Sequence, residues 1–293
     1  MHVTTEEVNP SSKDIDAQGV EEIFAIMNEQ DSEVAAAVKR AGPAICRAIN
    51  DAVDTIRNGG RLLYVGAGTS GRLGVLDASE MPPTFSVSPS LISAVIAGGH
   101  QAITTSVEGA EDDEEAGTRV INNIGCNDMI IGITASGKAP FVLAALKEGK
   151  RRSIKCWLLT CNDVSYDFVD GTMAVITGAE IVAGSTRLKA GTATKMVLNM
   201  ISTIAMIRLG RVYRGHMVDV VPSNDKLRRR ALRIVQELTG CCADRACELL
   251  EMARGSAKTA VLMQLRENDY EMAVQLLQGA GGSLRQALEK EAK

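Results

Sequence analysis

The chain has 293 residues, of which 45% are apolar and 23% are charged, and its formal net charge is −4. This length allows one large domain or two small ones with a substantial core, and the composition is that of an ordinary globular protein. The net charge argues against a general nucleic-acid binder. The basic run at Arg228-Arg229-Arg230 is interpreted as a solvated helix face.

Several features predict a cytoplasmic protein without a metal site. The first residues, MHVTTEEVNPSSKDID, lack the basic and apolar regions of a secretion signal. No apolar stretch approaches membrane-spanning length, so we expect no membrane contact. The seven scattered cysteines contain no Cys-x-x-Cys pair, which favours a reducing compartment. The three histidines, His2, His100 and His216, have no metal-ligand spacing.

Residues 1–57 are expected to form a polar arm followed by helices. A helical pattern begins near Gly19 and continues through Met27. A second pattern covers 32–57, with apolar residues at spacings of three and four. Pro43 falls inside the second pattern, so a break or kink is expected there.

Residues 58–222 alternate between predicted strands and helices. Apolar runs predict strands near 62–65, 91–97, 128–133, 153–160 and 173–177. Helices between them imply parallel pairing, so the predicted fold is an α/β open parallel sheet flanked by helices. A long apolar helix is expected over 192–209. Residues 223–293 are expected to be helical, with one helix over 224–238 and a small three-helix module reaching Lys293.

The first predicted strand runs into a glycine loop that suits an anion. The loop contains Gly66, Gly68 and Gly71, and a helical pattern follows directly. Free N–H groups at a helix start point toward whatever the loop holds. The helix is expected to end near Glu80, against Pro82-Pro83.

A second loop after the third strand repeats this device. Ser136 and Gly137 follow that strand as Thr69 and Ser70 follow the first. Both loops should lie at the same edge of the sheet, where such folds bind small molecules. We interpret Gly68, Thr69, Ser70, Ser136 and Gly137 as phosphate-binding residues.

The glycine spacing also matches a dinucleotide-binding fingerprint. That fold wants an acidic residue at the end of the next strand, and the sequence there, Val95-Ile96-Ala97-Gly98-Gly99, has none. Short hydroxyl donors suit a terminal phosphate better than a pyrophosphate. A phosphomonoester is therefore favoured, although glycines that merely turn the chain remain an alternative.

Glu80 is a candidate acid or base because it follows the phosphate loop and few charges surround it. A solvated carboxylate near a helix end is the alternative interpretation. Several carboxylates lie between Val107 and Asp112, and the pattern alone does not choose among them.

Longer motifs resemble a known family. The segment GAEIVAGSTRLKAGT, residues 178–192, resembles the signature shared by N-acetylmuramic acid 6-phosphate etherases and the glucokinase regulatory protein. YVGAGTSGRLGVLDASEMPPTF, IAGG, VEGAED, TASGKAP, MVDVVPSNDKL and the amino-terminal TTEEVNPSSKDID also resemble the etherases. The resemblance covers nearly the whole chain.

The resemblance implies a sugar isomerase (SIS) domain that works as a homodimer. It implies a lyase that cleaves the D-lactyl ether of N-acetylmuramic acid 6-phosphate, giving N-acetylglucosamine 6-phosphate and D-lactate in cell-wall recycling. By motif, the two catalytic glutamates fall on Glu80 and Glu111. We assign Glu80 as the proton donor to lactate and Glu111 as the base for C2 or for the water.

The expected chemistry is an elimination followed by water addition, which needs acid–base groups and a held phosphate. We therefore expect no cofactor. Ser185, Arg187 and Lys189 are further candidates for contacts to substrate, although Arg187 and Lys189 could equally form loop ion pairs. Two alternatives stay open: a non-catalytic phosphosugar sensor and an aldose–ketose phosphosugar isomerase.

Overall fold

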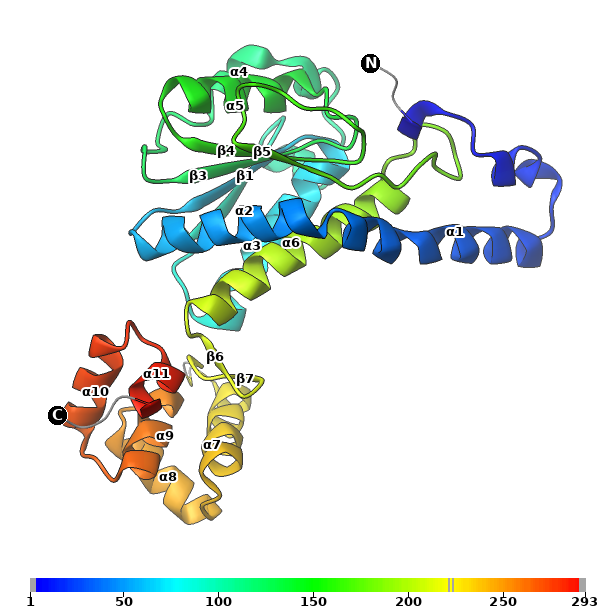
Figure 1. The fold of residues 1–293 in the computed structure, drawn as a ribbon. Helices are drawn as coiled ribbons and strands as arrows, with labels where there is room; N and C mark the ends of the chain where they lie inside the picture. The colour runs from blue at the N-terminus through cyan, green and yellow to red at the C-terminus, as the bar shows by residue number, and fades with distance from the viewer. Residues whose placement is uncertain (1–3, 221, 223, 290–293) are drawn as a thin grey trace. The chain divides into compact units, whose positions relative to one another are not determined.

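The computed structural model of the chain describes residues 4–220, 222 and 224–289. Its contacts divide the chain into two compact units, which are described separately (Figure 1). Unit 1 comprises Met1–Glu80 and Pro89–Ser202, and unit 2 comprises Met81–Ser88 and Thr203–Lys293. This division joins the N-terminal helices to the sheet. The domain boundaries after residues 57 and 222 remain predictions.

A five-stranded parallel sheet forms the centre of unit 1. Its strands are β1 (Leu62–Gly66), β2 (Ile92–Ile96), β3 (Met129–Ile133), β4 (Lys155–Thr160) and β5 (Gly171–Ala174). The strand order is β2-β1-β3-β4-β5, and every pair is parallel. The predicted open parallel sheet is confirmed, and the bounds of each strand lie within three residues of the predicted range.

Helices cover both faces of this sheet. The helices before, between and after the strands are α1 (Val20–Arg40), α2 (Gly42–Arg57), α3 (Gly68–Phe85), α4 (Glu114–Arg119), α5 (Pro140–Arg151) and α6 (Lys189–Arg208), of which all but α1 cover the sheet. In Figure 1, α4 and α5 lie on one face, and α2, α3 and α6 lie on the other. On the α5 face, Leu63 and Val65 of β1 pack with Phe141 and Leu146 of α5 in one buried cluster. The central strands β1 and β3, and β4 apart from Lys155, are buried, as expected for a parallel sheet that is covered on both faces.

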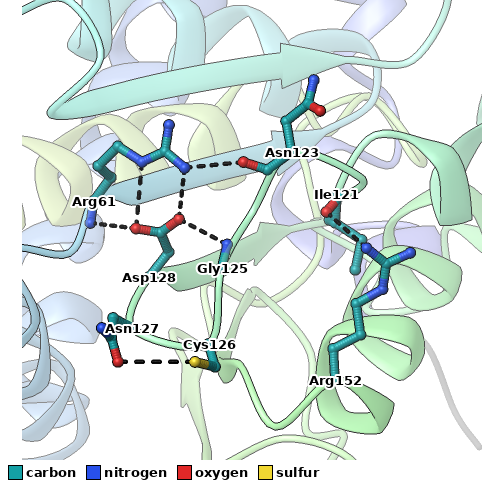
Figure 2. Close-up of polar contacts among 8 residues, drawn as sticks. All are labelled: Arg61, Ile121, Asn123, Gly125, Cys126, Asn127, Asp128 and Arg152. Atoms are coloured by element: carbon teal, nitrogen blue, oxygen red, sulfur yellow. Dashed lines mark hydrogen bonds and ion pairs between the residues drawn. The ribbon is translucent and has the colours of Figure 1, made fainter.

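The amino ends of β1 and β3 are joined by a polar network (Figure 2). Asp128 is buried and accepts hydrogen bonds from the Arg61 backbone N–H at 2.7 Å and from the Arg61 guanidinium, with Nη2 also 2.7 Å away. The Gly125 N–H donates to the same carboxylate at 2.9 Å. Burial alone would raise the pKa of Asp128, but the hydrogen bonds from Arg61 and Gly125 hold it below its usual value.

The observed helices differ from the predicted ones in two places, and a third expectation, at Pro43, is met. The chain is helical from Val20 to Arg40 without the expected gap after Met27, and the break falls at Ala41. The break expected at Pro43 is confirmed, since α1 ends at Arg40 and Pro43 lies in the first turn of α2, where a proline gives up no intrahelical hydrogen bond. In α3, the helix continues through Pro82 and Pro83 to Phe85, so the predicted end near Glu80 is wrong.

Helix α6 corrects a further expectation. It is 20 residues long with a mean hydropathy of 1.2, so by length and composition it could cross a membrane. The prediction that no apolar stretch approaches that length is therefore wrong. In the structure, 56% of this segment is buried within the protein, as in a core helix. Val197, Leu198 and Ile201 are fully buried.

Unit 2 is mainly helical among the described residues. It contains the hairpin β6 (Val212–Tyr213) and β7 (His216–Met217), then α7 (Asp225–Thr239), α8 (Ala243–Met252), α9 (Ala257–Arg266), α10 (Tyr270–Gly279) and α11 (Leu284–Glu289). Five described helices replace the predicted helix and three-helix module, since Gly240, Gly255, Glu267 and Gly281 each break the chain with positive φ. Residues 290–293 of the predicted module lie outside the described residues.

Candidate functional site

The first glycine loop joins β1 directly to α3. The first hydrogen bond of α3 runs from the Gly71 N–H to the Ala67 carbonyl oxygen at 3.2 Å. The N–H groups that precede it at the start of the helix have no acceptor within the helix. Together with the Thr69 and Ser70 hydroxyls they can bind an anion.

Glycine is required in this loop for close packing. A Cβ on Gly71 would lie 2.6 Å from the Ile96 side chain, and one on Gly66 would lie 2.7 Å from the Gly71 nitrogen. Strand end and helix start thus touch through bare backbone. The loop therefore has a fixed geometry before any ligand binds.

The second loop follows β3 and is held by side chains. The hydroxyls of Thr134 and Ser136 lie 3.2 Å apart, and the Ser136 hydroxyl accepts a hydrogen bond from the Lys138 N–H at 3.1 Å. The Gly137 N–H donates to the Thr134 carbonyl oxygen at 3.0 Å. Ser136 is thereby fixed before the helix α5 begins at Pro140.

Both loops open at the point where the strand order reverses. β1 and β3 are neighbours, while the chain passes from β1 outward to β2 before returning to β3. In open α/β sheets, ligands bind at this switch point, outside the carboxyl ends of the strands. The predicted meeting of the two loops is confirmed.

A cavity of about 270 Å³ lies between these loops. The first loop contributes Ala67, Gly68, Thr69 and Ser70, and the second contributes Ile133, Thr134, Ala135, Ser136 and Ala139. Four residues from elsewhere in the chain complete the lining: Glu6, Glu111, Gly184 and Thr186. The cavity thus combines hydrogen-bond donors from the loops with two carboxylates.

Glu111 belongs to a short 3-10 turn, Ala110–Asp112, placed over the cavity by Gly109 in the left-handed conformation. The residue as a whole is exposed to solvent. Its carboxyl group is partly desolvated, which raises the pKa of Glu111, and the negative charge of Asp112 raises it further. A raised pKa brings a carboxylate closer to the working range of a general base at neutral pH.

Glu80 does not line this cavity within the chain. It is exposed on α3, twelve residues after Gly68, which is roughly 18 Å along the axis at 1.5 Å per residue. The two predicted catalytic glutamates are therefore not brought together in this cavity by one chain.

The other predicted site residues lie around the cavity without lining it. Gly137 is buried behind the second loop, Arg187 is exposed, and Ser185 is half-buried. Lys189 is buried, and its Nζ lies 3.0 Å from the Gln30 side-chain oxygen. Desolvation lowers the pKa of Lys189, and the nearby Glu180 opposes this shift.

Glu180 explains why α6 begins earlier than predicted. Its carboxylate is fully buried and accepts hydrogen bonds from the Lys189 and Ala190 N–H groups at 3.0 and 2.9 Å. Those N–H groups belong to the first turn of α6, which leaves them without acceptors in the helix. Glu180 therefore fixes the loop that brings Gly184 and Thr186 to the cavity.

Sequence reasoning missed Glu6, Thr134, Gly184 and Thr186 as cavity residues. Thr134 directly follows β3, so its place at the strand end could have identified it. Gly184 and Thr186 are the sequence neighbours of the predicted Ser185 and Arg187. The loop there is irregular, so its sequence does not show which of these residues face the cavity. Glu6 is far from the other residues in sequence, and no local pattern marks it.

Comparison with known proteins identifies the family. Residues 44–150 match the glucokinase regulatory protein N-terminal SIS domain. A solved phosphoheptose isomerase from Francisella tularensis is 20% identical, with a TM-score of 0.48, and the match covers 65% of this chain and 97% of that one.

Much closer relatives match along nearly their whole length. The N-acetylmuramic acid 6-phosphate etherase of Geobacillus thermodenitrificans is 48% identical over 292 residues, covering 98% of this chain and 99% of the relative. The Escherichia coli protein of the same name is 45% identical, and the match covers 98% of each chain. The chain therefore belongs to the N-acetylmuramic acid 6-phosphate etherase family.

Proposed function

We propose that the chain is a lyase that cleaves the D-lactyl ether of N-acetylmuramic acid 6-phosphate, giving N-acetylglucosamine 6-phosphate and D-lactate. The observation that carries this function is a single cavity in which two anion-binding loops and the Glu111 carboxylate converge. The name and the identity of the relatives support the same substrate. A cavity of about 270 Å³ is at the small end for ligand sites, which suits a phosphosugar better than a dinucleotide.

The reaction begins from the open-chain form of the sugar. The aldehyde at C1 acidifies the C2 proton, which a carboxylate removes. The C3–O bond then breaks, and the lactate oxygen leaves with a proton from an acid. Water adds at C3 of the unsaturated aldehyde, and a proton returns to C2, so the net change is hydrolysis of the ether.

We assign Glu111 as the base for C2. It lines the cavity, and partial desolvation raises its pKa. A higher pKa makes the carboxylate a stronger base for the C2 proton. The phosphate is bound by other residues of the cavity wall, which are Gly68, Thr69, Ser70 and Ser136. Fixing the phosphate positions the sugar carbons relative to Glu111, which lowers the entropic part of the barrier.

We assign Glu80 as the proton donor to lactate, acting from a second copy of the chain in a homodimer. The support is geometric: within one chain, Glu80 lies roughly 18 Å along α3 from the start of the phosphate loop. Its carboxylate is exposed and therefore open to another molecule. Isologous dimers place the same residue pair at two equivalent sites.

Mixing two inactive variants tests this shared site. In a Glu80→Gln and Glu111→Gln heterodimer, one site would carry both substitutions and the other neither. Random exchange of subunits would then restore about a quarter of the wild-type activity, since half the dimers are mixed and each has one intact site. No recovery after verified subunit exchange contradicts the shared site.

D-lactate assay of the purified protein with N-acetylmuramic acid 6-phosphate tests the function itself. Release of D-lactate with formation of N-acetylglucosamine 6-phosphate is expected. Binding without turnover would instead indicate a phosphosugar sensor, and interconversion of an aldose and a ketose phosphate would indicate an isomerase.

We also propose that the protein works in the cytoplasm. All seven cysteines are free thiols, as is usual where the environment is reducing. Cell fractionation with a lactyl ether cleavage assay tests this location. Activity confined to a secreted or membrane fraction contradicts it.

A further inference from the structure

Glu6 is a cavity residue with no role in the function described above. It ends the 3-10 turn Thr4–Glu6 in the N-terminal arm, here defined as residues 4–18. It lines the same cavity as the two phosphate loops and Glu111. The arm therefore brings a second carboxylate to the site from the other side of the sequence.

Buried contacts fix the backbone next to Glu6. Thr5 is fully buried, and its carbonyl oxygen accepts a hydrogen bond from the Gly184 N–H at 3.0 Å. The Asn162 side-chain amide donates to the Thr5 hydroxyl at 3.1 Å, and the Thr4 hydroxyl donates to the Asn162 side-chain oxygen at 2.9 Å. The Glu6 side chain thus starts from an anchored turn, even though its own residue is exposed.

The same amide holds the second phosphate loop. Asn162 Nδ2 also donates to the Ala135 carbonyl oxygen at 2.8 Å, and Ala135 lines the cavity. Asn162 is itself fully buried. The arm and the loop are therefore positioned against one common group.

Glycine at position 184 gives the Glu6 carboxylate its place. A Cβ on Gly184 would lie 2.9 Å from a Glu6 carboxylate oxygen, and the residue has a φ of +75°. The carboxylate packs against bare backbone there. Among residues 4–220, 222 and 224–289, no ion pair or side-chain hydrogen bond engages this carboxylate, so its acceptor capacity remains for a ligand.

We propose that Glu6 binds the sugar part of the substrate, its carboxylate accepting hydrogen bonds from hydroxyl groups of the phosphosugar. This inference rests on the proposed function. An ionised carboxylate repels a phosphate dianion but accepts strong, charge-assisted hydrogen bonds from hydroxyl groups. The loops bind the phosphate end, and Glu6 therefore selects for a polyhydroxylated carbon chain attached to it.

Kinetics of Glu6→Gln, which keeps the shape and removes the charge, test the proposal. KM for N-acetylmuramic acid 6-phosphate should rise roughly tenfold or more, as for loss of a hydrogen bond to a charged group. The kcat value should stay within about threefold, because uniform binding is lost rather than transition-state stabilisation. Inhibition by inorganic phosphate should be unchanged or stronger, since a neighbouring negative charge is gone.

Three results would overturn the proposal. One is an unchanged KM. Another is a parallel weakening of phosphosugar and inorganic phosphate binding, which would mean that the arm only holds the loop. The third is a fall in kcat of about 100-fold at constant KM, which would make Glu6 an acid or base. Glu6→Asp, which retains the charge, should recover part of the lost affinity.

A matched control is Glu21→Gln, which removes an exposed carboxylate from the first turn of α1 away from the cavity lining. It should leave KM unchanged. The test also separates two failures. If the wild type releases no D-lactate, the proposed function fails, and calorimetric binding of N-acetylglucosamine 6-phosphate and of inorganic phosphate to wild type and Glu6→Gln still tests Glu6. If the wild type is active and Glu6→Gln matches it, only the role of Glu6 fails.

Discussion

The two ends of β1 and β3 use their polar groups in opposite ways. At the amino ends, the Asp128 carboxylate accepts hydrogen bonds from the backbone and guanidinium of Arg61 and from Gly125 (Figure 2). At the carboxyl ends, the N–H groups that begin α3 and the hydroxyls of the two loops line a cavity. The same two strands therefore carry one end whose polar groups bond to each other and one end that lines the cavity proposed to bind the substrate.

The difference follows from the direction of a parallel sheet. All strands begin at one edge, so their connections there can pair with one another. All strands end at the other edge, where helix N-termini point their N–H groups outward. Substitutions at the amino end should thus change stability without changing catalysis, and substitutions at the carboxyl end should do the reverse.

Among these substitutions, Glu111→Gln should have the largest effect on catalysis. Loss of the general base is expected to lower kcat by about 10²- to 10⁴-fold. The melting temperature should remain near that of the wild type, because the residue is exposed. Steady-state D-lactate release and thermal unfolding together check both halves. Near-normal turnover would remove Glu111 from the mechanism.

Asp128→Ala should have the converse effect. It leaves the Arg61 and Gly125 N–H groups without their acceptor and breaks a half-buried ion pair, so the free energy of unfolding should fall by about 2–4 kcal/mol. We expect a loss near the lower value, because the Arg61 side chain is 42% exposed and solvent screens its charge. Denaturant titration measures the change, and kcat/KM per folded molecule should not change.

The stability that Asp128 provides should depend on pH. Its pKa is held below the unfolded value of about 4, so the carboxylate stays charged in the folded protein where the unfolded chain binds a proton. The contribution is complete above the unfolded pKa and is lost as pH falls through the folded one. The gap in unfolding free energy between wild type and Asp128→Ala should therefore narrow below about pH 4, and a constant gap would contradict the ion-pair account.

Ser136→Ala should have a smaller effect at the open end. Removing one hydroxyl from the phosphate site is expected to raise KM by about tenfold and leave kcat nearly unchanged. Ser70→Ala in the first loop should behave similarly. The control is Ser165→Ala, an exposed serine outside the cavity lining, which should leave KM unchanged. Equal KM values for all three variants would argue against phosphate binding by the loops.

Asp112→Asn should produce the smallest change, a shift in the pH profile. The Asp112 charge raises the pKa of Glu111 beyond the effect of desolvation. Removing that charge should move the acidic limb of the kcat/KM profile to lower pH, because the base then stays deprotonated further into the acid range. If the acidic limb does not move, the group that titrates there is not Glu111.

The sheet and the two loops could be predicted because their signals are local. Each strand is an apolar run closed by glycine or polar residues, and each loop follows its strand directly. The ends of α2 and α3 could not be predicted from prolines alone. Pro43 could have kinked or begun a helix, and the continuation of α3 through Pro82 and Pro83 contradicts the usual interior penalty.

The parts of the site that sequence reasoning missed depend on long-range contacts. Glu180 fixes the start of α6 through two backbone N–H groups, and this contact forms only after the loop between them has folded. Glu6 reaches the cavity through Asn162, more than 150 residues later in the chain. The family motif pointed to Glu80 and Glu111 together, but motif matching carries no information on distance, and only Glu111 lines the cavity.

Asn162 joins the N-terminal arm to the second loop of the proposed phosphate site. One buried amide donates both to Thr5 of the arm and to Ala135 of the second loop. We therefore expect ligand binding at the loop and docking of the arm to stabilise each other. Such coupling is reciprocal. Saturation with inorganic phosphate should slow amide hydrogen exchange at Gly184, whose N–H donates to the Thr5 carbonyl oxygen. Removal of the arm should lower the affinity for phosphate by the factor by which phosphate favours docking of the arm.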